Sequence, residues 1–354
     1  MLLILKVFFF SPVFNNRSFL QADQLFRCPG YHLFFKREER KFKTTLSDTH
    51  MAWCLYRLEA DQLREVLYAV YQEQTDKSLY TYKSLRIGAI DGSVMGKQYV
   101  SVFQLLSRQA PFILDCEGYI SRGRELAAGC VLMSRLTQKL GSFVDLIVVD
   151  GLYKLKMLKF FDELGIKTLI KTSEERLAPM DELDSLLASE LGADFIKTCK
   201  GFDEKRHEKY TMYMMPYEWQ GTLITVVKVE EEKLKPRKNE NPFSTFYIIT
   251  NQPDLNMHEM RKIAKLRWNI ENNGFKELSA YAKTKHAYSK SWTVTEKLLL
   301  FFFLSYNLIK LFKHALEKQG ENHKALLGKV KMTILFFVKK ISMLPDRRLR
   351  GDTS

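Results

Sequence analysis

The sequence predicts an α/β protein with a mixed β-sheet flanked by helices. Two observations lead to this fold class: short apolar runs separated by Gly, Ser and basic residues follow Lys83, and segments of helical periodicity then alternate with further apolar runs. The 354-residue chain is 46% hydrophobic and can bury a substantial core. We therefore expect a globular protein of one large or two ordinary domains.

Residues 1–83 are expected to form a helical N-terminal region. In LSDTHMAWCLYRLEADQLREVLYAVYQ, Ser47 or Asp48 can cap a helix, and apolar residues recur at helical spacing after them. The apolar opening MLLILKVFFF lacks a basic segment before it and a small-residue cleavage site after it. We therefore do not interpret the opening as a secretion signal.

Residues 84–173 follow the element order of a ribonuclease H-like domain. Three strands are expected at 85–90, 99–106 and 110–115. A helix in RGRELAAGCVLMSRLTQKLG then stops at Gly141, the run FVDLIVVD is typical of a strand buried on both faces, and a helix and a strand follow in YKLKMLKFFDELG and IKTLIKT. The order is β-β-β-α-β-α-β, with Asp91 ending the first strand and Asp150 ending the fourth.

An insertion of mainly β structure is expected over residues 174–255, because KYTMYMMP, GTLITVVKVEEE and STFYIITNQ are strand-like. Residues 256–318 would complete the domain with the helix MHEMRKIAKLRWNIE and a long apolar helix, and residues 319–354 would form a basic helical tail. The apolar run LLLFFFLSYNLI has 12 residues, against the roughly 20 that a membrane span needs. We expect a buried helix and no membrane segment.

Composition narrows the class of function. A formal net charge of +14 attracts polyanions, either nucleic acid or an anionic membrane surface. Five widely spaced cysteines without a CxxC pair disfavour a zinc site or a disulfide scaffold and are typical of thiols in a reducing compartment, so we expect a cytoplasmic protein. Neither GxGxxG nor GxxxxGK[ST] occurs, so a loop that binds nucleotide phosphates is unsupported.

Three acidic residues are the candidate active site: Asp91 in IDGS, Asp150 in VVDGLY and Glu271 in RWNIENNGF. Carboxylates from distant segments suit a polynucleotidyl transferase, whose two divalent cations lie about 3.5–4 Å apart and need several hard oxygen ligands. Arg267 lies four residues before Glu271, shares a helix face with it and is suited to hold a phosphate oxygen. The alternative readings are turn chemistry for the two Asp-Gly pairs and an ordinary surface ion pair for Arg267 and Glu271.

These pieces together resemble a DDE transposase of bacterial insertion sequences, of the insertion-sequence-4 type. The resemblance runs from about Thr44 to about Lys313. It is carried, in family order, by LSDTHMAWCLYRLEADQLREVLYAVY, IDGS, RGRELAAGCVLMSRL, VVDGLY, RWNIENNGFKEL and TKHAYSKSWTVTEKLLLFFFLSYNLIKLF. It implies a ribonuclease H-like catalytic domain interrupted by a β-rich insertion. Family members usually have more helical sequence before Ser47, so truncation of the N-terminal region is an open alternative.

The resemblance implies an enzyme that cleaves and joins the ends of its own mobile element. Asp91, Asp150 and Glu271 would be both catalytic residues and metal ligands for Mg²⁺, with Mn²⁺ as a substitute. Its partners would be double-stranded DNA, both inverted-repeat ends and target, and a second copy of the chain in a homodimer on DNA. The enzyme would be associated with the nucleoid, and no membrane would be involved.

The residues expected to bind DNA phosphates are Arg267, Lys276 and Lys285. The family signature places a Tyr three residues before the Arg and a Lys seven residues after the Glu, but Ala264 and Leu278 occupy these positions. ENNGF resembles a variant of the signature with one extra residue, so we expect a local helix bulge at Gly274. The phosphate-binding cation would then come from Lys276, Lys283 or Lys285.

Two other functions remain open on the sequence. One is a decayed, transposon-derived DNA-binding protein without catalysis, which the altered signature favours. The other is a different ribonuclease H-like, metal-dependent nuclease, such as a junction resolvase, which cuts without rejoining strands.

Overall fold

The computed structural model describes residues 47–319, apart from gaps at 75–76, 108, 122, 174–175, 190–191, 193, 237–239, 269, 283 and 286–288. The apolar opening and the basic tail, on which predictions were made, lie outside the described residues. The chain divides into two compact units. The first holds the chain up to Leu79, Gly92–Leu132 and the chain from Asn272, whereas the second holds Tyr80–Asp91 and Met133–Glu271.

The first unit packs helices against an antiparallel set of strands. Its described elements are α4 (Asp48–Arg57), α5 (Ala60–Glu73), most of η2 (Lys77–Tyr80), the end of β2 (Leu85–Met95), β3 (Gln98–Leu105), β4 (Phe112–Tyr119), the start of α6 (Glu125–Leu140), α10 (Lys276–Ala282) and α11 (Trp292–Gln319). β3 lies between β2 and β4 and pairs antiparallel with β4. As the sequence predicts, the N-terminal helix is capped by Ser47, whose hydroxyl accepts a hydrogen bond from the His50 N–H.

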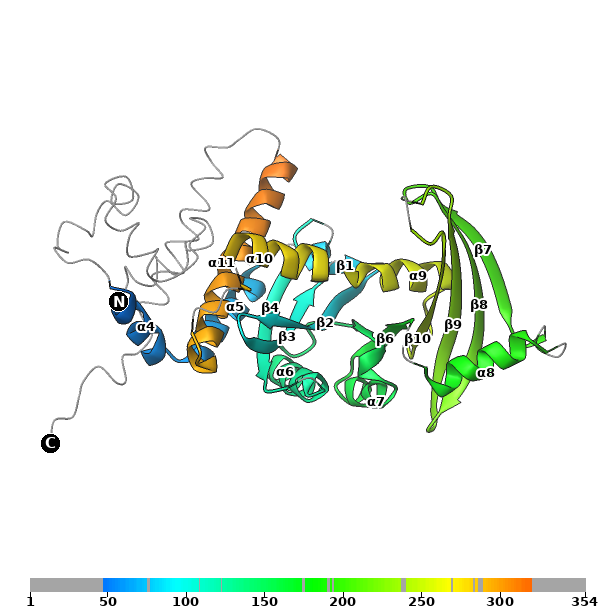
Figure 1. Ribbon diagram of the computed structural model, residues 1–354, viewed down its shortest axis with the longest axis horizontal. Helices are drawn as coiled ribbons and strands as arrows, with labels where there is room; N and C mark the ends of the chain where they lie inside the picture. The colour runs from blue at the N-terminus through cyan, green and yellow to red at the C-terminus, as the bar shows by residue number, and fades with distance from the viewer. Residues whose placement is uncertain are drawn as a thin grey trace. The chain divides into compact units, whose positions relative to one another are not determined.

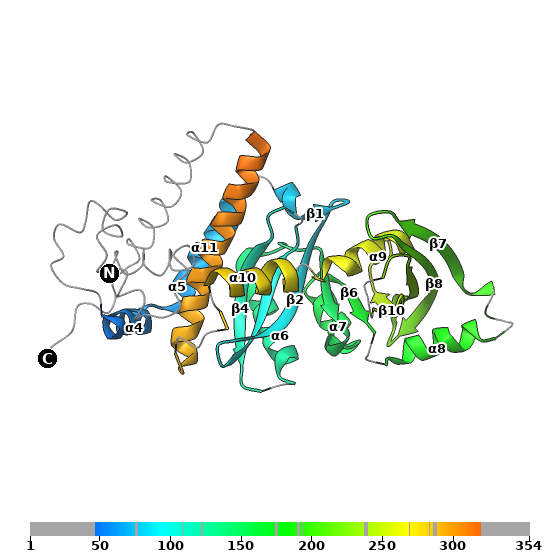
Figure 2. The ribbon, with the colours of Figure 1, turned by 45° about the horizontal axis from the view of Figure 1, so that its top comes forward.

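Helix α11 forms the core of this unit, running beside α5 and β4 (Figure 2). By length and composition alone its segment Trp292–Ala315 could cross a membrane, which is weak evidence because core helices pass the same test. The side chains of residues 298–307 are buried, and the Asn307 amide group hydrogen-bonds the backbone N–H and C=O of Ile113 in β4. The apolar run is therefore a buried helix within the unit, as its length predicts.

The second unit is a large mixed sheet with helices on its faces. Its described elements are β1 (Thr81–Tyr82), the start of β2, the end of α6, β5 (Leu146–Asp150), η3 (Gly151–Tyr153), α7 (Lys156–Glu163), β6 (Lys167–Thr172), α8 (Ala178–Leu187), β7 (Lys197–Asp203), β8 (Glu208–Trp219), β9 (Thr222–Lys233), β10 (Phe243–Thr250) and α9 (Met257–Leu266). The strand order is β2-β5-β6-β10-β9-β8-β7. β2, β5 and β6 are parallel to one another, and the remaining strands are antiparallel.

The insertion extends the sheet, because β10 pairs antiparallel with β6. It also contains two elements that the sequence reading missed, α8 and the edge strand β7. α8 and α9 cover opposite faces of these strands (Figure 1). On β9, Lys228 pairs with Asp184 of α8 and Glu231 pairs with Arg261 of α9, and residues three apart in a strand point to opposite faces.

The helix expected over MHEMRKIAKLRWNIE is interrupted. α9 begins with a capping box between Asn256 and Glu259 and ends at Leu266. A π-helical turn over Ile270–Phe275 (η5) follows and includes Gly274. The expectation of a continuous helix is therefore wrong, and the expected bulge at Gly274 is confirmed, because one extra residue in a helix is accommodated by widening a single turn.

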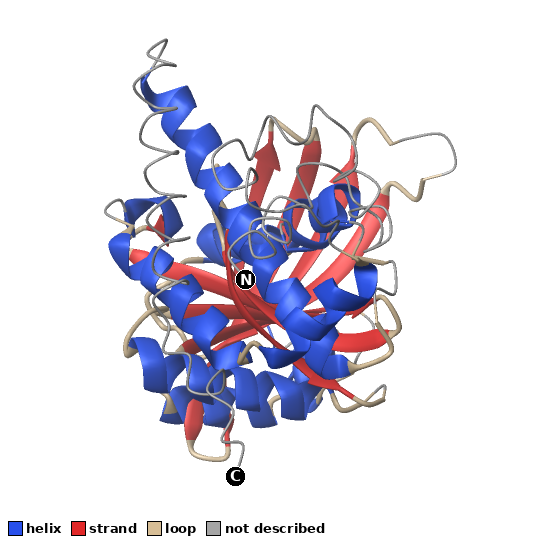
Figure 3. Ribbon diagram, turned by 90° about the vertical axis from the view of Figure 1, so that its left-hand side faces the viewer, coloured by secondary structure: helices blue, strands red, loops and turns tan. Residues whose placement is uncertain are grey.

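Both units combine strands, red in Figure 3, with helices, blue, so the protein is mixed α/β as predicted. The ribonuclease H-like assignment and the domain boundaries stay predictions.

Candidate active site

Asp91 and Asp150 lie at equivalent points of two neighbouring parallel strands. In β2 and β5 the paired residues are Ile87 with Leu146, Gly88 with Ile147 and Ala89 with Val148. The pairing ends at Ala89 and Val148, two residues before Asp91 and Asp150. Residues in register on parallel strands point to the same face, and neighbouring strands lie about 4.8 Å apart. Asp91 and Asp150 therefore follow the paired stretch at the same spacing, on two neighbouring parallel strands.

The local settings of the two aspartates differ from the sequence reading. Asp91 does not end its strand, because β2 continues to Met95 and its last part runs alongside β3. Turn chemistry is therefore excluded at Asp91. Asp150 does end β5, and its Oδ1 accepts a hydrogen bond of 3.0 Å from the Leu152 N–H, which caps the 3-10 turn η3. Asp150 therefore has the turn role that its Asp-Gly sequence predicts, and it remains a candidate site residue.

Gly92, directly after Asp91, is required by packing within the first unit. A Cβ atom there would lie 2.3 Å from Glu125 Oε2 and 2.7 Å from the Tyr119 hydroxyl oxygen. Real Cβ atoms essentially never approach that closely, so the Asp-Gly sequence reflects a close approach of side chains to the strand.

Arg267 joins the third acid to the first. Its Nη1 lies 3.3 Å from Asp91 Oδ2, and its Nη2 lies 3.3 Å from Glu271 Oε1. The Arg267 side chain is 13% exposed, and the Asp91 side chain is 12% exposed. Two acids 180 positions apart in the sequence therefore meet through one guanidinium, which is more than a surface ion pair between neighbours on a helix.

The donor set fits a hard divalent cation, because carboxylate oxygens are the ligands that Mg²⁺ and Mn²⁺ prefer. Across the part of the chain that the structure describes, no three Asp, Glu, His or Cys side chains are already gathered closely enough to hold one. Arg267 bonds the Asp91 and Glu271 oxygens that a cation would use. Metal binding would thus require the guanidinium to turn away from these oxygens.

Lys171 is a basic residue of this region that sequence reasoning missed. It lies on β6 as the register partner of Asp150. Its ammonium lies 4.5 Å from the ring centre of Phe246 and 5.8 Å from that of Trp268. Burial, and then the positive charge of Arg267, lower the pKa of Lys171 to about 8. Pairing the strand ends in register would have identified it.

The other two lysines that were predicted to bind DNA phosphates do not belong to the unit that contains the acids. Lys276, at the start of α10, and Lys285 are exposed and belong to the first unit, whereas the acids belong to the second. Their contact with DNA phosphates stays a prediction. At the two altered signature positions, Ala264 is 0% exposed and Leu278 is 1% exposed, so these residues fill the core and cannot replace the missing polar groups.

Comparison with known proteins leaves the family open. No protein-family model matches the chain, and no curated protein sequence matches it. Among solved structures, it is similar to the NurA nuclease from Sulfolobus solfataricus, with 15% identity and a TM-score of 0.29 over 74% of this chain and 95% of that chain. A TM-score this low does not establish a shared fold, so the function proposed below rests on the chain's own residues.

Proposed function

We propose that the protein is a Mg²⁺-dependent DDE-type DNA transposase with a ribonuclease H-like catalytic domain. The observation that supports the proposal is the link that Arg267 makes between Asp91 and Glu271. Asp91 and Asp150 lie on two neighbouring parallel strands, and Arg267 contacts both Asp91 and Glu271. Three carboxylates from three distant segments, set among cations, match the chemistry of phosphodiester cleavage and transfer.

The three acids act as metal ligands. A bound pair of Mg²⁺ ions would supply activation of water or of a DNA 3′-hydroxyl and stabilisation of the leaving oxygen. In the absence of metal, Arg267 neutralises part of the charge of Asp91 and Glu271 and keeps the two carboxylates close. Once released from them, its planar fork is suited to hold the scissile phosphate.

Two neighbours extend this site. Lys171 offers a second cation beside Asp150 and supplies the phosphate contact that Leu278 cannot make. Trp268 is 45% exposed, and its ring centre lies 5.9 Å from the Arg267 guanidinium and 5.8 Å from the Lys171 ammonium. An exposed indole beside phosphate-binding groups is suited to stack on an unpaired base at a cut end.

The net charge of +14 supports double-stranded DNA as the partner, as element ends and as target. Pairing two ends would take a homodimer on DNA. The expected place of action is the bacterial cytoplasm, at the nucleoid.

A second candidate function is DNA binding without catalysis. The observation that favours it is the signature itself, since Ala264 and Leu278 are buried apolar residues where the family has Tyr and Lys. A chain that had lost cleavage would keep its basic charge and bind DNA without needing a divalent cation.

The proposal is tested with a supercoiled plasmid that carries the gene and its flanking DNA, incubated with Mg²⁺ or Mn²⁺. Wild-type protein should nick at the element's repeats and join the ends to target DNA, and Glu271→Gln should bind the plasmid without nicking. Glu163→Gln, an exposed carboxylate at the end of α7, is the matched control and should behave as wild type. Metal-independent binding without a cut by any protein would instead establish the second candidate, and cutting without joining would indicate a nuclease.

A further inference from the structure

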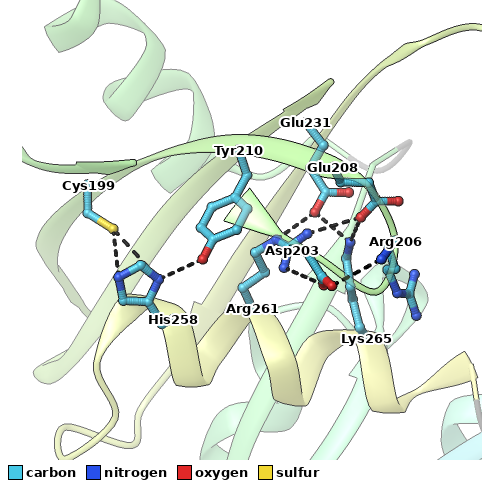
Figure 4. Close-up of polar contacts among 9 residues, drawn as sticks. All are labelled: Cys199, Asp203, Arg206, Glu208, Tyr210, Glu231, His258, Arg261 and Lys265. Carbon is cyan, nitrogen blue, oxygen red and sulfur yellow. Dashed lines mark hydrogen bonds and ion pairs between the residues drawn. The ribbon is translucent and has the colours of Figure 1, made fainter. Parts of the chain in front are cut away.

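A buried ionic cluster joins α9 to three strands of the insertion (Figure 4). Arg261 Nε donates to Glu231 Oε1 at 2.7 Å, its Nη2 donates to Glu208 Oε2 at 3.1 Å, and its Nη1 donates to Asp203 Oδ2 at 3.3 Å. These acceptors lie on β9, β8 and β7, respectively. Lys265, one helical turn later, contacts Glu208 at 2.5 Å and Glu231 at 2.7 Å. One arginine thus reaches three adjacent strands.

Most of the cluster is buried, and Asp203 at its edge is 26% exposed. The side chains of Arg261, Glu208 and Glu231 are 3%, 5% and 7% exposed. The Arg261 guanidinium also lies 4.0 Å from the ring centre of Tyr210. Gly201, the register partner of Tyr210 on β7, makes room for that ring, because a Cβ at Gly201 would lie 2.3 Å from it. Charges buried in this way tolerate few other arrangements, because moving the helix would leave a carboxylate without its partner.

This geometry fixes the rotation of α9 about its axis. At about 100° per residue, Arg261 and Lys265 share one face of the helix, whereas Arg267 points about 240° away from Arg261. One side of α9 is therefore held by the insertion while its C-terminal end directs Arg267 to Asp91. The insertion is also connected to the strand of Asp91 through the sheet, because β9 pairs with β10, β10 with β6, β6 with β5 and β5 with β2.

We propose that Arg261 is a positioning residue, through which the insertion sets Arg267 and Glu271 against Asp91. The expected effect of Arg261 on catalysis rests on the proposed function. Its expected effect on the position of α9 rests on contacts within the second unit. It assigns the insertion a role in building the active site, separate from any contact with DNA. Lys265 supports the same arrangement through two of the same carboxylates.

The test compares Arg261→Met with Arg261→Lys and with Arg86→Met as the matched control. Arg86 makes a two-pronged ion pair with Asp145 where β2 and β5 begin, at the other end of the strands from Asp91 and Asp150. The two readouts are hydrogen exchange of the backbone amides of residues 257–271, which needs no activity, and the Mg²⁺ concentration for half-maximal nicking. Thermal melting of each variant separates loss of stability from loss of position.

Arg261→Met should raise exchange in residues 257–271 and increase the Mg²⁺ requirement by about 10- to 100-fold, as supporting groups around metal ligands do. Lysine has a single ammonium for the three acceptors, so both readouts in Arg261→Lys should lie between those of Arg261→Met and wild type. Arg86→Met should leave both readouts at the wild-type level even where it lowers the melting temperature.

Wild-type exchange and Mg²⁺ requirement in Arg261→Met would overturn the inference. If Arg261→Met does not fold, Glu231→Gln, which keeps the volume and removes one charge, takes its place with the same expected direction. If the wild-type chain never cuts DNA, the proposed function fails, and hydrogen exchange alone then decides whether Arg261 holds α9.

Discussion

Replacing Lys171 by methionine should raise the free energy of unfolding of the protein at pH 7. Lys171 lies on β6 near the rings of Phe246 and Trp268, and burial is the main reason that its pKa falls to about 8, with the charge of Arg267 next. At pH 7 the ammonium is still protonated, so the folded protein holds a charge that its surroundings disfavour. Methionine keeps the length and removes the charge.

The magnitude follows from the pKa. The gap between 10.5 and about 8 corresponds to about 3.5 kcal/mol, at about 1.4 kcal/mol per pKa unit. Between pH 8 and pH 10.5 the unfolded chain binds this proton and the folded chain does not, so the free energy of unfolding of the wild type should rise with pH across that window. Below pH 8 both states are protonated, and the destabilisation is fully present. In Lys171→Met the free energy of unfolding at pH 7 should be higher by up to about 3.5 kcal/mol, and its rise between pH 8 and pH 10.5 should disappear.

Urea unfolding followed by circular dichroism at several pH values from 7 to 10 measures both effects. Lys228→Met is the contrasting control. Lys228 lies 3.2 Å from Asp184. Burial alone would lower the pKa of Lys228, but its hydrogen bond to the Asp184 carboxylate outweighs burial, so the pKa is raised. Loss of Lys228 should destabilise the protein. A Lys171→Met variant that is less stable than wild type at pH 7, or that keeps the same rise between pH 8 and pH 10, would refute the reasoning.

Three further outcomes are expected. Asp91→Asn should abolish Mg²⁺-dependent nicking in the plasmid assay yet leave DNA binding in a gel-shift assay intact, and nicking at the wild-type rate would remove Asp91 from the site. Gly118→Ala should lower the free energy of unfolding by about 1–3 kcal/mol, because its Cβ would lie 2.5 Å from the Trp292 ring; unchanged urea unfolding would contradict this packing. The logarithm of the DNA association constant should fall linearly with the logarithm of the salt concentration, and a flat dependence in fluorescence anisotropy titrations would exclude phosphate contacts as the main source of affinity.

Local patterns predicted most of the elements. Each of β5, α6 and α11 has an apolar pattern that is continuous over its own length. Gly141, at φ +64°, follows the end of α6. β7 was missed because KTCKGFD has few apolar residues, as an edge strand with one solvated face does. α8 was missed because the strand-like runs around it led to a mainly β assignment, although Pro179 is well placed in the first turn of a helix.

The candidate site residues were predictable where local sequence patterns mark them. Asp91, Asp150 and Glu271 stand beside strong local patterns, and Arg267 is four residues from Glu271. The contacts that join them are not local. Arg267 meets Asp91 176 residues away, and Arg261 meets Glu208 53 residues away, so strand order and register decide both. Without that register, Lys171 looked like one of many lysines.

The central claim is that Asp91, Asp150 and Glu271 hold divalent cations, and cleavage of the polypeptide by bound Fe²⁺ tests it most directly. With Fe²⁺ in place of Mg²⁺, ascorbate and peroxide generate hydroxyl radicals that cut the backbone next to the ion. The account predicts cuts close to residues 91, 150 and 271, which excess Mg²⁺ suppresses and Asp150→Ala removes. Cuts elsewhere, or cuts at these places that neither Mg²⁺ nor the substitution changes, would contradict it.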